Sequence, residues 1–134
     1  MLRSSAVIVS AVSAVIVSAF GAGTASAVTT VTGSTLTVRA AHSIVAAEAK
    51  DSIVASLSSH GQALANQRVL LESRSAGAKH FTVIGNGVTS SNGQVSFTVV
   101  PGMTTGHKEQ YVLRFRGNKA HRGSFSGVVT VTVR

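Results

Sequence analysis

The side chains that could do acid–base chemistry in this chain are few. The sequence has five histidines, four carboxylates and no cysteine. Nucleophilic catalysis needs a nucleophile, a base and a third group that orients the base. There is no Gly-x-Ser-x-Gly motif and no evident carboxylate pair for glycoside hydrolysis. The carboxylates that could orient a histidine are only Glu48, Asp51, Glu72 and Glu109. We therefore predict that the protein is not an enzyme and has no catalytic residues.

The histidines are also poorly spaced for holding a metal ion. A zinc site needs ligands that converge at short spacing, and no two histidines stand two or four positions apart. Lys108 lies between His107 and Glu109 and disfavours a cation there. The five histidines are His42, His60, His80, His107 and His121, and most of them fall in separate predicted loops. We predict no metal site and no cofactor.

The stretch "RFRGNKAHRG", residues 114–123, is the best candidate for a binding site. Its potentially basic side chains are Arg114, Arg116, Lys119, His121 and Arg122. Such a cluster creates a local positive field, and the net charge of the whole chain is +8. We predict that these five residues bind a polyanion, with anionic cell-wall polymer as the partner. The alternative is that they only solvate an outer face and deter edge aggregation.

A specific nucleic-acid partner is not expected. Base stacking requires exposed aromatic side chains, and the chain has five phenylalanines, one tyrosine and no tryptophan. The strand pattern directs most of these aromatic residues into the core.

The N-terminus has the three parts of a secretory signal. Met1-Leu2-Arg3 is a short positive start, residues 6–20 are uncharged and apolar, and Ala25-Ser26-Ala27 offers small residues for a peptidase. The apolar run is shorter than the roughly 20 residues of a membrane span. We predict a signal peptide over residues 1–27, cleaved after Ala27, and no membrane span afterwards. Retention as an anchor is the alternative. The product would be secreted, and extracellular or associated with the cell wall.

The remaining chain reads as a flexible lead-in, residues 28–34, and one domain, residues 35–134. Because there is no cysteine, no disulfide can stabilise an exported fold, and a packed core must do so. Apolar residues alternate with polar ones, as in strands, over residues 35–39, 51–57, 67–74, 81–85, 94–100, 110–117 and 127–134. Residues 42–57 also suit an amphipathic helix by composition, but we favour strand–turn–strand because every flanking segment is β. The pattern predicts an all-β fold, a single antiparallel β-sandwich of about seven strands.

Glycine and proline mark the ends of several of these strands. Asn92-Gly93 predicts a hairpin, and Gly85-Asn86-Gly87 predicts a bulge or an edge. Pro101 cannot donate to a β-ladder and should end the strand before it. Residues 58–66, 102–109 and 118–124 are expected to be loops.

The order of these signals resembles the bacterial immunoglobulin-like domains of secreted and cell-surface proteins. The resemblance rests on "HGQALANQRVLLESR" (residues 60–74), "TSSNGQVSFTVVP" (89–101), "YVLRFRGNKAHRGSFS" (111–126) and "VTVTVR" (129–134). It covers residues 35–134. Ala63, Ser90 and His121 depart from the family pattern, which usually has proline, an acid and an aromatic residue there. The resemblance implies an immunoglobulin-like sandwich whose matching residues are turn and core positions.

These observations predict a secreted, non-catalytic module with a binding or structural role at the cell envelope. The alternative is a small secreted inhibitor or effector that binds another extracellular protein through an exposed loop such as residues 102–109. Salt separates the two, because screening weakens contacts between exposed charges more than apolar contacts. The sequence indicates no oligomeric state.

Overall fold

The computed structural model describes residues 31–134, so the predicted signal peptide lies outside the described residues. Within them the chain forms strands and no helix. The strands are β1 (Thr35–Ala40), β2 (Ile44–Val45), β3 (Asp51–Ser59), β4 (Gln62–Ala63), β5 (Arg68–Ser75), β6 (Thr82–Val88), β7 (Gln94–Val99), β8 (Lys108–Gly117), β9 (Arg122–Phe125) and β10 (Val129–Val133). In this part of the chain, no helix is long and apolar enough to cross a membrane.

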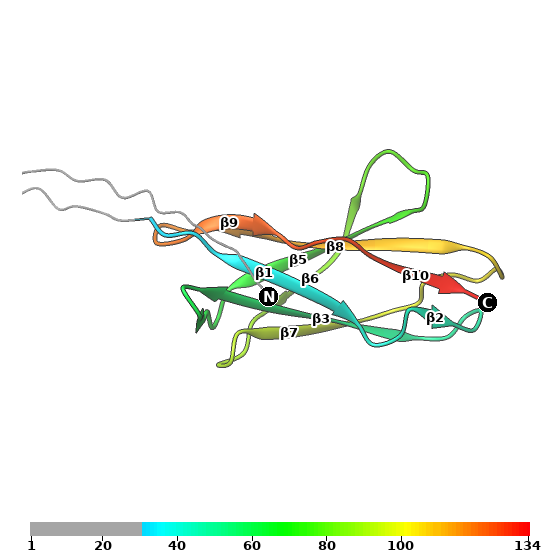
Figure 1. Cartoon of the computed structure of the whole chain (residues 1–134), viewed down its shortest axis with the longest axis horizontal. Coiled ribbons are helices and arrows are strands. Elements are labelled where there is room, and N and C mark those ends of the chain that lie inside the picture. Colours follow the sequence, from blue (N-terminus) through cyan, green and yellow to red (C-terminus); the bar gives the residue numbers. More distant parts are fainter. Residues whose placement is uncertain (1–30) are drawn as a thin grey trace, which may run out of the picture.

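The strands form two sheets that run along the long axis of the molecule (Figure 1). In the smaller sheet β3 is central, with β1 on one side and β7 and the short β4 on the other. The larger sheet has the order β2-β10-β8-β5-β6, and β9 pairs with β8 beyond β10. All named strand pairs are antiparallel except β2 with β10, which is parallel. The all-β class is confirmed.

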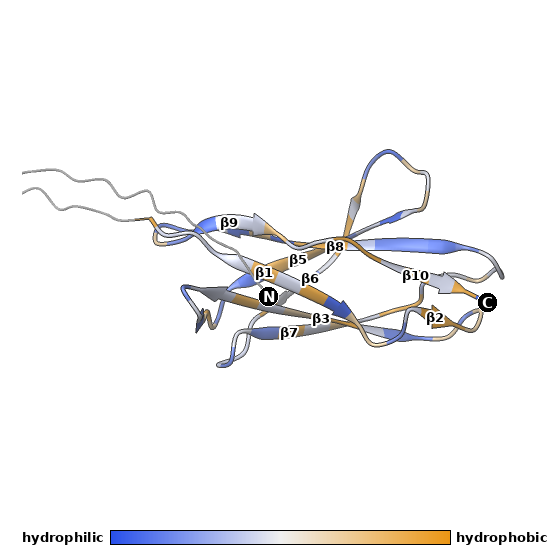
Figure 2. Cartoon of the chain, viewed as in Figure 1, coloured by the Kyte–Doolittle hydropathy of each residue, from blue (hydrophilic) through white to orange (hydrophobic). Residues whose placement is uncertain are grey.

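Alternating side chains build the core between the sheets. Along β3 every second residue is buried, from Asp51 to Ser59. On β8 the core residues are Tyr111, Leu113 and Phe115, as the two-residue period predicts. Figure 2 shows the same alternation of hydrophobic and hydrophilic residues along β1.

Residues 42–57 form strand–turn–strand, as predicted. Ala46 to Lys50 turn the chain between β2 and β3. Glu48 adopts a left-handed backbone conformation with φ of 66°. Its N–H donates to the carbonyl of Gly102 at 2.9 Å, which fixes the turn against the loop after β7.

The predicted hairpin at Asn92-Gly93 is wrong, although the turn forms. Gly93 has φ of 78°, and its N–H donates to the carbonyl of Ser90 at 2.9 Å. However, β6 pairs with β5 while β7 pairs with β3, so the turn carries the chain from one sheet to the other. The reason is that a turn sequence fixes the reversal but not the strand with which each arm pairs.

Two predicted loops contain short strands. In residues 58–66, His60 and Gly61 have φ of 51° and 77°, and they fold β4 back onto the end of β3. In residues 118–124, the chain returns as β9 beside β8. Both segments are polar or glycine-rich, which hides them from a search for apolar alternation.

The predicted bulge or edge at Gly85-Asn86-Gly87 is confirmed in both senses. The β5–β6 register shifts between Leu71 and Glu72, and β6 stands at the end of its sheet. Gly87 is also a point of close approach, because a Cβ there would lie 2.6 Å from Cγ2 of Val95. The two sheets therefore touch where β6 leads into the turn towards β7.

Candidate functional site

The alternation of β8 puts Arg114 and Arg116 on the outer face of the larger sheet. Their neighbours Leu113 and Phe115 point into the core. Arg116 is exposed, whereas the side chain of Arg114 is 38% exposed. The two guanidinium groups therefore face the same side of the sheet but sit in different environments.

Arg114 already has two partners on that face. Its Nη1 lies 3.4 Å from Oε2 of Glu72, whose side chain is only 10% exposed. Its guanidinium also lies 5.4 Å from the ring centre of Phe125 on β9. Because Glu72 would otherwise be a buried charge without a partner, Arg114 has a structural role as well as a surface charge.

The other three predicted residues lie around the turn between β8 and β9. The side-chain oxygen of Asn118 accepts from the N–H groups of Ala120 and His121, each at 2.8 Å, which shapes the turn. Lys119 is exposed at its tip. His121 is half-buried, and its buried Nδ1 has no hydrogen-bond partner among residues 31–134.

Arg122 points away from the arginines of β8. Arg122 pairs with Gly117, the residue after Arg116. Because successive residues of a strand point to opposite faces of the sheet, the side chain of Arg122 lies on the face opposite to Arg116. Its N–H donates to the carbonyl of Thr32, and its carbonyl accepts from Ser34 Oγ at 2.6 Å. Thr32 and Ser34 thus tie the end of the predicted lead-in to β9. Of the five predicted residues, the structure gathers only Arg114 and Arg116 on one face.

Two further arginines, which the sequence reading missed, share that outer face. Arg68 and Arg74 lie on β5, which pairs with β8 so that Leu70 faces Arg114 and Arg74 faces Gln110. The two-residue period around the buried Val69 does direct both arginines outward. The pairing with β8, some 40 residues further along the chain, carries no local signal in the sequence. We call Arg68, Arg74, Arg114 and Arg116 the arginine face.

Neighbouring side chains hold two of these arginines in place. Nη1 of Arg68 donates to Asn86 Oδ1 at 2.6 Å. Nε of Arg74 donates to Gln110 Oε1 at 2.8 Å, and its guanidinium lies 4.3 Å from the ring centre of Phe81. Phe125 adds an aromatic side chain that is 63% exposed and borders a shallow hollow with Arg114 and Arg116. The face therefore offers ordered guanidinium groups and an exposed ring.

The carboxylate–histidine pairs fasten loops. Nδ1 of His42 lies 3.0 Å from Oδ1 of Asp51, whose buried carboxylate also accepts from the backbone N–H groups of His42 and Ser52. Nε2 of His107 lies 2.8 Å from Oε1 of Glu109. Within residues 31–134 no group of three histidine or acidic side chains could hold a metal ion.

Comparison with known proteins adds no relative from which a function could be transferred. No protein-family model, curated protein or solved structure matches the chain.

Proposed function

We propose that this chain is a secreted, non-catalytic immunoglobulin-like module that binds anionic polymers of the cell envelope through its arginine face. The single observation that carries the proposal is the convergence of four arginines from β5 and β8 on one exposed sheet face, around one buried carboxylate, that of Glu72.

The strand order supports the immunoglobulin-like part of the proposal. In that architecture the first, second and fifth strands share one sheet, and the third, sixth and seventh share the other. Here β1, β3 and β7 would be the first set, and β5, β8 and β10 the second, with β6 as the added edge strand. One departure is that no strand within residues 31–134 pairs with the free side of β7, because the short β4 pairs with the end of β3 instead.

The spacing of the arginines suits a flexible polyanion. Residues two apart on a strand lie roughly 6.5 Å apart, so Arg114 and Arg116 could contact successive phosphates of a linear polymer. A guanidinium can donate two parallel hydrogen bonds to a phosphate. Because Arg114 is shared with Glu72, Arg68 and Arg116 would contribute most of the contact.

Sedimentation with a defined polyanion tests the proposal. Purified protein is mixed with long-chain polyphosphate beads, and separately with cell walls, across a salt series. The test variant is Arg68→Ser/Arg116→Ser, which leaves the Arg114–Glu72 pair intact. The matched control is Arg39→Ser/Lys50→Ser, which removes the same charge from exposed positions on β1 and before β3.

We expect salt-sensitive binding that the test variant weakens roughly tenfold, or about 1.4 kcal/mol, and that the control variant weakens much less. Equal losses in the two variants would mean that net charge, rather than the arginine face, attracts the polymer. No binding of the unchanged protein to either material at low salt would refute the proposal.

The loop of residues 102–109 supports the second candidate, a protein-binding inhibitor or effector. Met103 at its tip is 66% exposed. The loop is nevertheless held at both ends, because Gly102 accepts from Glu48 and the N–H of Gly106 donates to Val133 at 2.7 Å. A rigid loop with an apolar tip is a common way to bind a protein. A protein partner captured equally well at low and high salt, and lost in Met103→Ser, would favour this candidate.

A further inference from the structure

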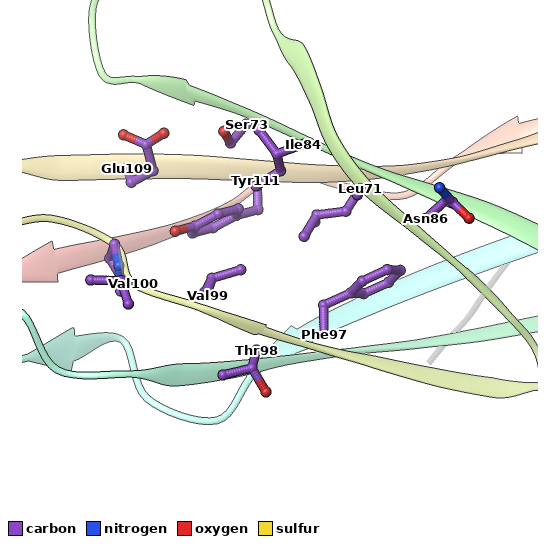
Figure 3. Close-up of a pocket in the computed structure, with 12 residues that line it drawn as sticks. Leu71, Ser73, Ile84, Asn86, Phe97, Thr98, Val99, Val100, Glu109 and Tyr111 are labelled. Carbon is purple, nitrogen blue, oxygen red and sulfur yellow. The ribbon is translucent and has the colours of Figure 1, made fainter.

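The free edges of β6 and β7 face one another across an open slot. Within residues 31–134, β6 ends its sheet and β7 pairs only with β3. The two strands touch where Gly87 meets Val95, and from there they diverge. A pocket of about 510 Å³ opens between them (Figure 3). This volume is in the range of known ligand pockets.

The walls of the slot are apolar. Leu71 and Tyr111 from the larger sheet point towards Phe97 and Val99 of β7 across the opening (Figure 3). Ile84 and Val100 also line it, and these two side chains are 51% and 47% exposed. The slot is therefore a continuation of the hydrophobic core that nothing within residues 31–134 covers.

Polar groups stand at one end of this apolar lining. Ser73 pairs with Tyr111, and Ser75 pairs with Glu109, so all four lie on the inner face of the larger sheet. Ser75 Oγ and His107 Nε2 both contact Oε1 of Glu109. The Tyr111 hydroxyl has no hydrogen-bond partner among the described residues. Polar side chains on an inner face are unusual in a sandwich core, and here they border the opening.

Two carboxylates act on the Tyr111 side chain in the slot, although the protein as a whole is basic. Burial raises the pKa of Tyr111, and the charges of Glu109 and Asp51 raise it further. The hydroxyl is therefore a neutral donor at ordinary pH. Glu109 is the charged side chain that lines the slot, so a bound group that carries a positive charge is favoured and an acid is disfavoured.

The two edges lack the usual protection against strand pairing. Natural proteins commonly blunt a free edge with charged residues or proline. β6 reads TVIGNGV and β7 reads QVSFTV, with no charged residue and no proline in either. In a chain with 16 charged residues, 12 basic and four acidic, these neighbouring edges stand out as competent to pair. The bulge in β6 interrupts its ladder, so β7 offers the more regular edge.

We propose that the slot binds an extended segment of a partner protein, which adds as a strand beside β7. Its alternate apolar side chains enter the pocket between Leu71 and Phe97, and a lysine or arginine reaches Glu109. The unpaired backbone groups of β7 favour a peptide over a small apolar molecule, because only a peptide can pair with them along the strand. The slot uses none of the arginine face, so this inference and the proposed function can fail independently.

Disulfide tethering tests the proposal, because the chain has no cysteine of its own. Val100→Cys places one thiol at the rim of the slot. The probes are the synthetic peptides acetyl-CGTVTVTVR-amide, the same peptide ending in glutamate, and acetyl-CGTVPVTVR-amide, whose proline removes a backbone donor. Each peptide is supplied as its mixed disulfide with 2-mercaptoethanol, and thiol–disulfide exchange with the protein thiol, which releases 2-mercaptoethanol, is equilibrated at increasing concentrations of that reductant. The control anchor is Thr130→Cys, an exposed position on β10.

We expect the arginine peptide to remain attached at Val100→Cys at roughly threefold higher reductant than the glutamate peptide, the size of a partly exposed ion pair. The proline peptide should be released earliest. Amide exchange in residues 94–99 should slow most with the arginine peptide and least with the proline peptide. Thr130→Cys, which lies beside Gln110 on the outer face, should show no preference for the arginine peptide over the glutamate peptide. Glu109→Gln in the Val100→Cys protein should abolish the preference for arginine.

Three results would overturn the proposal. Equal retention of all peptides at Val100→Cys would show that the slot recognises none of them. Retention without slower exchange in residues 94–99 would indicate pocket filling without strand addition. A disulfide-linked dimer of Val100→Cys formed in preference to any peptide adduct would assign the slot to a second copy. If Glu109→Gln fails to fold, the comparison of the arginine and glutamate peptides on the intact site decides alone.

Discussion

The arginine face and the β6–β7 slot are built by the same two strands and have opposite character. On β5 and β8, residues of one parity include Arg68, Arg74, Arg114 and Arg116, and residues of the other parity include Leu71, Ser73, Glu109 and Tyr111. One side of the sheet is therefore cationic, while the other is apolar with a negative end. Because side chains alternate across a strand, a shift of one residue separates two surfaces that would attract different partners.

The two regions also differ in what holds their side chains. Three arginines on the face each have a polar partner: Asn86 for Arg68, Gln110 for Arg74 and Glu72 for Arg114. In the slot the Tyr111 hydroxyl has no partner within residues 31–134. Most guanidinium groups of the face thus have partners within the protein, whereas the Tyr111 hydroxyl in the slot is available to a ligand. Three measurements test this contrast.

The largest effect should come from truncating a side chain on the inner face of β8, compared with truncating one on its outer face. Leu113 is fully buried, so Leu113→Ala should lower the free energy of unfolding by about 3 kcal/mol through lost burial and the cavity left behind. Arg116→Ala should change it by less than about 0.5 kcal/mol. Urea denaturation of both variants measures the difference. A similar loss in the two would mean that the arginine face is part of the core.

A smaller effect should separate the two arginines of β8. Arg114→Ala leaves the nearly buried Glu72 without its charged partner, and we expect a loss of about 1–2 kcal/mol. The double variant Arg114→Ala/Glu72→Gln should recover part of that loss, because no carboxylate then remains unpaired. Denaturation curves for the single and double variants form the test. If Arg114→Ala is as mild as Arg116→Ala, the Arg114–Glu72 contact is not structural.

Much of the fold follows from local features of the sequence, namely the alternation of apolar and polar residues and the positions of glycine. The buried positions of β3 and β10, and the core residues Tyr111, Leu113 and Phe115 of β8, follow directly from the two-residue period, whereas the buried Val112 does not. The bulge at Gly85-Asn86-Gly87 follows from the known backbone preferences of glycine, and the turn between β2 and β3 is predicted from the β character of the segments that flank it. These features depend on neighbours in sequence, so they can be predicted from a single chain.

The features that fail to be predicted depend on partners distant in sequence. Asn92-Gly93 encodes a turn, but the pairing of its arms with β5 and β3 is decided by core packing. Arg68 joins Arg116 only because β5 lies beside β8. Arg122 leaves the predicted cluster because the length of the β8–β9 turn sets its parity, and glycine and polar residues hide that turn's geometry.

The smallest effect concerns Tyr111, the one tyrosine of a chain without tryptophan. Burial and the nearby carboxylates raise its pKa in the folded protein, whereas an unfolded tyrosine ionises near pH 10. A raised folded pKa contributes stability that is fully present below pH 10 and is lost as the pH rises above it. Spectroscopic titration should therefore show no phenolate at pH 10 while the protein stays folded, and Tyr111→Phe should remove the signal. At neutral pH the free energy of unfolding of Tyr111→Phe should differ from that of the original protein by less than about 0.5 kcal/mol, because the Tyr111 hydroxyl makes no hydrogen bond within residues 31–134. A large loss would instead mean that the hydroxyl is bound within the fold, and the slot would lose the polar group that distinguishes it from a packing defect.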